Sequence, residues 1–252
     1  MNGQLSPSDG TLAEAPTTGL KPITWAEFGR EMGIILIVGA AVWALFAYVI
    51  YPPLGWPKLA PVPARTVVLV GLVWWLMRKR GESFRDIGLC RPKKIWLAAL
   101  LGILFLASNL FIVSQAVQAL REALGVAPGD QSILAGIHGD LALYIMWLVI
   151  AWVAAGFGEE IFIRGYLMNR LATLFGGEKL GWTLAIIGQG VIFGMLHAYA
   201  GFGGVMVIGL SAMVTGVYYL IAGRNIWPLI FVHGAWDTLG ITLYYLKGVP
   251  EL

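Results

Sequence analysis

The feature that most constrains this sequence is a succession of apolar stretches, each long enough to cross a lipid bilayer. A transmembrane helix needs about 20 mostly apolar residues. The fourth stretch is expected to continue to about Leu171 and to turn at Gly176-Gly177 into the fifth. We predict an all-α fold, a polytopic transmembrane helical bundle of about seven helices (six to eight). The stretches are residues 32–51, 60–77, 95–119, 141–158, 182–197, 202–220 and 226–246.

The composition agrees with a membrane protein. Of the 252 residues, 58% are hydrophobic and only 12% are charged, whereas globular domains carry about 25% charged residues. So few charges cannot cover the surface of a soluble domain. The net charge of +3 does not indicate nucleic-acid binding, because the basic residues lie in loops between the apolar stretches. Cys90 is the single cysteine, which excludes an internal disulfide and a cysteine-based metal cluster.

The distribution of charge predicts the domain organisation and the orientation. Residues 1–31 are polar and are expected to form a disordered cytoplasmic tail, followed by a single transmembrane domain over 32–252. The loop 78–94 contains seven basic and two acidic residues, so it is expected on the cytoplasmic side. Alternation then places the loop 120–140 outside, where His138 is expected to be a solvated surface residue. The small size and the absence of a transit peptide favour a bacterial inner membrane.

Six ionisable residues lie within or beside the apolar stretches, where a charge costs several kcal/mol and indicates a functional site. Glu160 and Arg164 are four residues apart, so they share a helix face and are expected to pair. Glu159 is turned about 100° away and is free to face a cavity. The six residues are Glu159, Glu160, Arg164, His197, His233 and Asp237.

Two further motifs show the same spacing. Phe193 and His197 share a helix face, and so do His233 and Asp237. Each motif also has a purely structural interpretation. Glu159 then marks the end of a span, His197 is a core histidine, and His233 forms an internal hydrogen bond with Asp237.

The depths of these residues predict that they meet. Glu159 lies 17 residues before Gly176 and His197 lies 21 residues after it, so their depths differ by only about 6 Å. Gly156 and Gly158, just before Glu159, would let another helix or a substrate backbone come close. We expect one cavity facing the cytoplasm, lined by Glu159, His197, His233 and Asp237.

At these positions the sequence resembles the CAAX protease and bacteriocin-processing family, which includes the eukaryotic type II CAAX prenyl endopeptidase. The family pattern is EExxxR, then FxxxH, then HxxxN or HxxxD. The stretch Ile87-Gly88-Leu89…Arg91-Pro92 resembles the family's lead-in, so the resemblance covers about 87–240. The motifs HExxH, GxGD and GxSG of other intramembrane proteases do not occur. The matching residues here are Glu159-Glu160…Arg164, Phe193…His197 and His233…Asp237.

The resemblance implies an intramembrane endopeptidase of the CAAX-protease type, acting on a membrane-associated or lipidated protein or peptide. It implies that Glu159 and His197 activate a water molecule and that His233 and Asp237 complete the catalytic site. Supporting roles fall to Glu160, Arg164 and Phe193.

Two mechanisms stay open for such a site. In one, Glu159, His197 and His233 bind zinc or another divalent metal, which lowers the pKa of a bound water. In the other, Glu159 is a general base without metal, and His233 stabilises the oxyanion. The eukaryotic enzyme has Asn at the last motif position, whereas this sequence has Asp237, which suits a metal ligand or a residue that orients His233. Asp237 therefore favours a metalloprotease.

Two other function classes are compatible with the same residues. A non-proteolytic relative, such as a bacteriocin self-immunity protein or a membrane chaperone, would keep them without turnover. A small proton-coupled transporter would use Glu159 and the histidines as a relay. Transporters more often show inverted repeats with broken helices, and no such repeat is found here. In every class the lipid bilayer is the expected partner, and nucleic acid is not.

Overall fold

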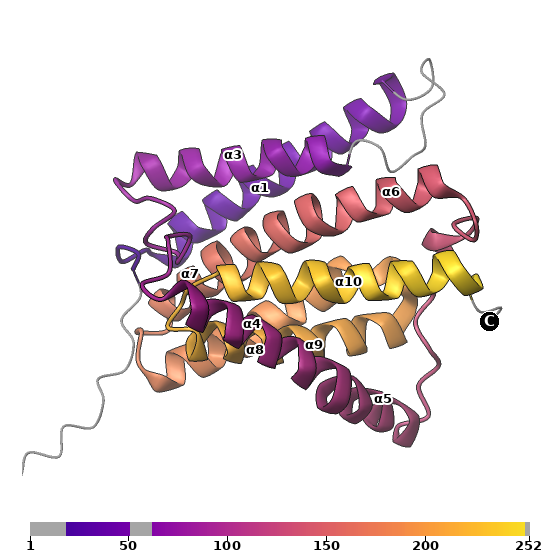
Figure 1. Cartoon of the computed structure of the whole chain (residues 1–252). Helices are drawn as coiled ribbons and strands as arrows, with labels where there is room; N and C mark the ends of the chain where they lie inside the picture. Colours follow the sequence, from indigo (N-terminus) through magenta and orange to yellow (C-terminus); the bar gives the residue numbers. More distant parts are fainter. Residues whose placement is uncertain (1–18, 51–61, 250–252) are drawn as a thin grey trace, which may run out of the picture.

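Seven helical rods, packed side by side, make up the described part of the chain (Figure 1). The computed structural model describes residues 19–50 and 62–249, and this part contains no strand. The prediction of a polytopic helical bundle is confirmed. The rods are α1 (Trp25–Ala44) with η1 (Leu45–Ile50); α3 (Val62–Lys79); α4 (Ile95–Ser108) with η2 (Asn109–Val113) and α5 (Ser114–Ala123); α6 (Leu141–Val149) with η4 (Ile150–Leu167) and α7 (Met168–Leu174); α8 (Lys179–Leu196); α9 (Gly201–Ile221); and α10 (Trp227–Lys247).

Five of these rods are long and apolar enough to cross a membrane, and they begin at Trp25, Ile95, Leu141, Lys179 and Ala198. The other two, α3 and α10, have 18 and 21 residues and are not among the five. The predicted spans therefore all correspond to helices, although two of the helices are less apolar than the rest. In α10 the polar residues are those of the last sequence motif, His233 and Asp237.

The first helix starts earlier than the apolar pattern predicts. Thr24 accepts a hydrogen bond from the Glu27 amide, and the Glu27 side chain bonds back to the Thr24 amide. This reciprocal capping box fixes the helix start. Leu20, just before it, is buried in the core with 6% of its surface exposed. The expected tail therefore does not extend to residue 31, and its residues 1–18 lie outside the described part, as does residue 51 at the end of the first predicted span.

The basic loop 78–94 lies at one end of the bundle, which we call the basic end. There Glu82 accepts from the Lys21 amide at 2.8 Å, and the Ile226 amide donates to the Gly88 carbonyl at 3.1 Å. The α7–α8 turn lies at the same end (Figure 1). It passes through Gly176 and Gly177, both with positive φ as the sequence predicts.

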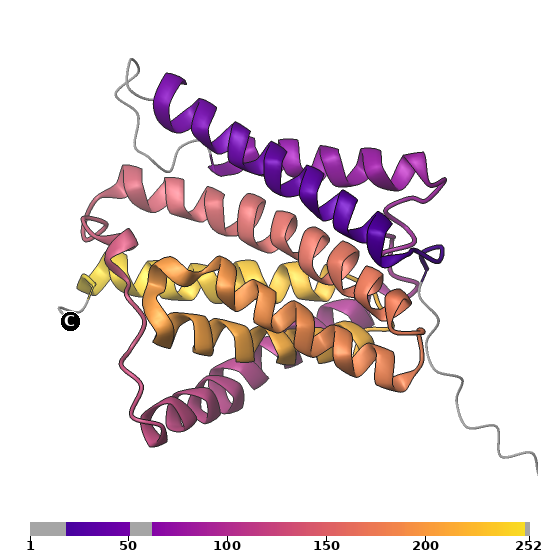
Figure 2. The same ribbon diagram turned by 180° about the vertical axis from the view of Figure 1, so that it is seen from behind.

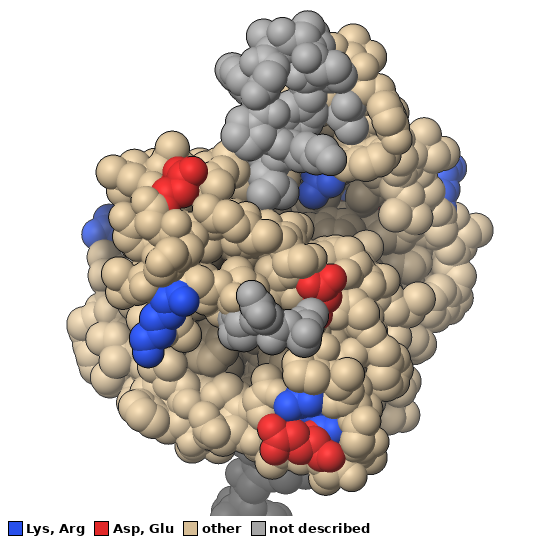
Figure 3. Space-filling model, turned by 90° about the vertical axis from the view of Figure 1, so that its right-hand side faces the viewer, with Lys and Arg blue, Asp and Glu red and all other residues tan. Residues whose placement is uncertain are grey.

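The loop between α5 and α6 lies at the opposite end. Its Asp130 amide donates to the Ala200 carbonyl at 2.9 Å, and its Gly139 amide donates to Tyr245 at 3.1 Å. Figure 3 looks onto this end and shows few charged side chains on a mostly uncharged face. Figure 2 shows the α8–α9 turn (orange) at this end, away from the basic loop. The two ends thus differ in charge, as the positive-inside pattern requires.

Candidate active site

Glu160 is the buried centre of the candidate site. It lies on η4, the π-helical part of the long fourth rod, and none of its surface is exposed. One of its carboxylate oxygens, Oε1, is 2.7 Å from Arg164 Nη1 and 2.7 Å from His233 Nδ1. The predicted pairing of Glu160 with Arg164 is therefore present. The contact with His233, which comes from α10, is one that sequence reasoning missed.

The contact with Glu160 decides how the His233 ring is held. A carboxylate accepts hydrogen bonds, so the proton lies on Nδ1, and Nε2 is the nitrogen directed at the other acidic residues. Nε2 is 3.8 Å from Glu159 Oε2 and 3.8 Å from Asp237 Oδ2. Asp237 was expected as a metal ligand or as the residue that orients His233, and both roles stay predictions. Glu160 makes the shorter contact with the ring, 2.7 Å against 3.8 Å.

Glu159 and Asp237 are accessible, unlike the residues beneath them. Their side chains are 36% and 30% exposed, and that of His233 is 18% exposed. At 3.8 Å the two carboxylates are too far from Nε2 for direct hydrogen bonds, and a distance of this kind leaves room for polar groups to be bridged by water. Three polar side chains from two rods thus face a common space.

His197 adjoins this group through Phe193. It caps the end of α8, and its Nδ1 is 2.9 Å from the Phe193 carbonyl oxygen. The Phe193 ring is 4.6 Å from the His197 ring, 6.4 Å from the His233 ring and 5.0 Å from the Arg164 guanidinium carbon. His197 is also close enough to Asp237 for an electrostatic interaction. The predicted Phe193–His197 face is confirmed, and Phe193 joins α8 to the other two rods of the site.

Tyr199 is a site residue that sequence reasoning missed. Its ring lies 5.6 Å from the ring of His197. The charges of Glu159 and Asp237 both act on its hydroxyl, and 59% of its surface is exposed. A single tyrosine near a helix end is ordinary in a membrane protein, so no sequence signal would have selected it.

Small residues let the rods come close enough to form the site. A Cβ at Gly156 would lie 3.1 Å from the Ile230 carbonyl oxygen and 3.3 Å from the Gly234 amide, both on α10. A Cβ at Gly158 would overlap Thr66 of α3. The expectation that Gly156 and Gly158 admit other helices is therefore confirmed. This close approach of α10 is what brings His233 to Glu160.

The comparison with family models agrees with the motifs. Residues 141–239 match the model of a family described as type II CAAX prenyl endopeptidase Rce1-like. Over this segment the chain is similar to that family. The match contains all three motifs of the candidate site but not the lead-in at 87–92, so it is shorter than the predicted 87–240. At the level of the family, this match supports a CAAX-type intramembrane protease. The apolar rods together with the match indicate an integral membrane protein. No curated protein and no solved structure matches the chain.

The candidate residues are not gathered as a three-ligand metal site. Among the described residues, no group of three or more His, Cys, Asp or Glu side chains is placed to hold a metal ion. Nδ1 of His197 is bound to the carbonyl of its own helix and Nδ1 of His233 to Glu160, contacts that metal-bound histidines also make while Nε2 binds the ion. The metal set Glu159, His197 and His233 therefore stays a prediction.

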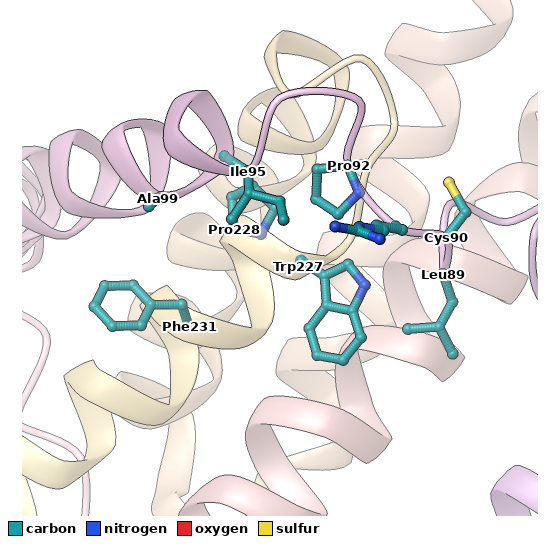
Figure 4. A pocket seen from close by; sticks show the side chains of 10 residues that line it. Leu89, Cys90, Pro92, Ile95, Ala99, Trp227, Pro228 and Phe231 are labelled. Atoms are coloured by element: carbon teal, nitrogen blue, oxygen red, sulfur yellow. The ribbon is translucent and has the colours of Figure 1, made fainter.

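A separate cavity of about 500 Å³ lies at the basic end, between the loop 89–92, the start of α4 and the start of α10 (Figure 4). Trp227 and Phe231 of α10 face Pro92 and Ile95 across it (Figure 4). None of the six ionisable motif residues lines it. His138, exposed in the opposite loop as expected, is not brought to the site either.

The site residues lie at different distances from the basic end. His197 follows the 18 residues of α8, which starts at that end, whereas His233 is only six residues beyond Trp227, the first residue of α10. That the site faces the cytoplasm therefore stays a prediction.

Proposed function

We propose that this chain is an intramembrane endopeptidase in which Glu159 activates a water molecule against a peptide bond of a membrane-associated or lipidated polypeptide. The observation that carries the proposal is the position of His233 Nε2, 3.8 Å from both Glu159 and Asp237. The buried pair of Glu160 and Arg164 fixes this position from beneath. Preorganised polar groups of this kind lower the energy of a charged transition state.

The proposed reaction is hydrolysis with general-base catalysis. Glu159 removes a proton from the water, and the water oxygen attacks the carbonyl carbon of the peptide bond. In this step Nε2 of His233 also carries a proton and donates a hydrogen bond to the oxygen on which negative charge develops. The C–N bond then breaks, and the proton taken by Glu159 passes to the leaving amine. The products are a carboxylate and an amine, so the protein is unchanged after one turnover.

Variants of the exposed carboxylate test the proposal. Purified protein in detergent would be given a farnesylated CAAX peptide and an unmodified membrane-anchored peptide, and new termini would be detected by mass spectrometry. Loss of a general base typically lowers the rate by about 10²–10⁴-fold, so we expect this loss for Glu159→Ala. Glu178→Ala, an exposed residue at the basic end, is the matched control and should keep the wild-type rate. Equal rates for Glu159→Ala and wild type would contradict the proposal, and no cleavage by wild type would favour a non-proteolytic relative.

Chelation separates the two mechanisms. Because the site residues do not form a three-ligand set, we expect turnover to be unchanged after treatment with 1,10-phenanthroline and dialysis. A loss of turnover that is restored by added zinc would instead support the metal-dependent version, with Glu159, His197 and His233 moved into contact with the ion.

A further inference from the structure

The cavity at the basic end is apolar and lies at the surface of the bundle. Ile95, Ala98 and Ala99 of α4 line one side of it, and Trp227 and Phe231 of α10 line the other. Three of these side chains, those of Ile95, Trp227 and Phe231, keep 57%, 43% and 40% of their surface exposed. The rod that starts at Ile95 is apolar enough to cross a membrane, so apolar side chains exposed on it face lipid.

Small residues on α4 leave the space for this cavity. Ala98 and Ala99 have the shortest side chains that a helix carries apart from glycine. One turn farther along, a Cβ at Gly102 would lie 3.0 Å from Phe231 Cδ1, so the Phe231 ring packs on the α4 backbone there and bounds the cavity. The volume of about 500 Å³ falls within the range of about 300–1,000 Å³ that is usual for pockets of small organic ligands.

Three cations lie at the mouth of the cavity. Arg91 lines the cavity itself, and Lys93 and Lys94 line a neighbouring hollow that also includes Arg91. All three are exposed and directly precede the span that begins at Ile95, which places them at the depth of the lipid headgroups.

The protein does not neutralise these three cations. Arg91, Lys93 and Lys94 form no ion pair within the described residues, although other arginines of the chain do. The first turns of α4 and α10 contain no acidic residue. The mouth of the cavity therefore has an uncompensated positive charge.

Uncompensated cations above an apolar cavity are complementary to one class of ligand. An anionic phospholipid carries a phosphate at headgroup depth and acyl chains below it, and basic pockets between transmembrane helices bind such headgroups. A neutral lipid would leave the three cations without a counter-charge, and a free phosphate would leave the apolar walls without a partner. Trp227 fits the same depth, because Trp is enriched at membrane interfaces.

We infer that an anionic phospholipid binds at the basic end, with its phosphate against Arg91, Lys93 and Lys94 and an acyl chain in the cavity between α4 and α10. The lipid belongs to the leaflet that meets the basic end, and it joins α4 to the start of α10. The inference goes beyond the proposed peptidase function and does not depend on it, since none of the six ionisable motif residues lines the cavity.

Lipid binding to the purified full chain in a neutral detergent tests the inference. The probes are dioleoylphosphatidylglycerol, dioleoylphosphatidylcholine, which has the same chains but no net charge, and glycerol phosphate, which has no chains. Native mass spectrometry would measure bound lipid, and the melting temperature would be followed because a ligand of the folded state raises it. We expect one phosphatidylglycerol bound at least about tenfold more tightly than phosphatidylcholine, and no shift with glycerol phosphate.

Two variants test the two parts of the lipid site. The triple variant Arg91→Gln, Lys93→Gln, Lys94→Gln should bind both lipids with equal affinity. Ala99→Phe fills the cavity and keeps the cations, and it should bind phosphatidylglycerol at least about tenfold more weakly than wild type, because an acyl chain loses its buried contacts.

A matched control removes the same charge from other exposed positions of the basic loop that do not line the cavity, and it should bind like wild type. Its substitutions are Arg78→Gln, Lys79→Gln and Arg85→Gln.

Several results would overturn the inference. Equal affinity of wild type for the two lipids would show that charge is not recognised, and an equal stabilisation by glycerol phosphate would show that no chain is bound. An equal loss in the control would indicate general attraction to the basic end, and an unchanged affinity of Ala99→Phe would exclude the cavity. If one variant does not fold, the comparison of lipids on wild type and the other variant decide. None of these outcomes depends on peptidase activity.

Discussion

At the scale of single residues, the Glu160 carboxylate has two partners and no exposed surface. It is bonded to Arg164 on its own helix and to His233 on another. Arg164 is itself buried and also reaches the Ala212 carbonyl at 3.4 Å. A buried ion pair is costly to form and more costly to break, because the remaining charge then has no partner. Glu160 therefore links stability to the position of the His233 ring.

We predict that Glu160→Gln destabilises the protein and stops turnover. Removing one partner of a buried pair costs about 3–5 kcal/mol, and the amide cannot replace the charge that holds Arg164. The free energy of unfolding would be measured by denaturant titration in mixed micelles. Glu122→Gln is the control, because Glu122 pairs with Arg121 but has a side chain 69% exposed, and exposed substitutions usually change stability by less than about 0.5 kcal/mol. Similar losses in both variants would argue against a special role for Glu160.

At the scale of helices, the site depends on close packing of rods through glycine. The α8–α9 hairpin is an example, since a Cβ at Gly194 would lie 2.5 Å from the Val205 carbonyl oxygen and 3.1 Å from the Gly209 Cα. Small residues of this kind let membrane helices approach each other. Gly194 is three residues before His197, so the hairpin spacing also sets the position of that histidine. The π-helical winding of η4 is a second local feature of the site. Short π-helical segments are frequent at functional sites.

We predict that Gly194→Ala destabilises the protein by about 1–3 kcal/mol, the usual cost of overpacking, because the new methyl group meets backbone atoms that cannot rotate away. Thermal unfolding in detergent would measure the loss. Gly33→Ala in α1 is the matched control, since nothing lies within 4 Å of its Cβ position. In a helix interior Ala is favoured over Gly by about 0.5–1 kcal/mol, so the control should be neutral or slightly stabilised. A stabilised Gly194→Ala would show that the hairpin is less tightly packed than described.

At the scale of the whole molecule, a buried ionic network ties the basic loop and the first helix to the rod that carries the site. Arg170 of α7 donates to both oxygens of Glu82, at 3.0 and 2.7 Å. Its Nε is 3.5 Å from Glu31 of α1, and Glu31 accepts from the Tyr166 hydroxyl. The three charged residues are exposed by 5% or less. Segments distant in sequence are thus joined at the basic end of the bundle.

We predict that Glu82→Leu costs about 3–5 kcal/mol of stability, because Arg170 is left buried without its closest carboxylate. The double variant Glu82→Leu with Arg170→Met should regain most of this loss, since apolar replacement of both partners is often close to neutral. Unfolding titrations of both variants and of Arg170→Met alone would give the coupling between the two sites. Strictly additive losses would show that the pair is not coupled.

The sequence by itself determined the helices, the family motifs and the contacts made within one helix. The Glu160–Arg164 pair and the Phe193–His197 face follow from i, i+4 spacing, which fixes the neighbours of a residue once a helix forms. The turn at Gly176-Gly177 also depends on local backbone conformation alone. Sequence reasoning did less well at helix ends. Glu31 was assigned to a polar tail because the first apolar stretch was taken to begin at residue 32, and its buried role was missed.

Only the tertiary structure decided which helices meet and at which depth. Glu160 and His233 are 73 residues apart, and their contact requires the approach of α10 to η4 at Gly156 and Gly234. Tyr199 is brought to His197 for the same reason. None of these is a property of one helix, since each depends on how the packed faces of several helices fit together.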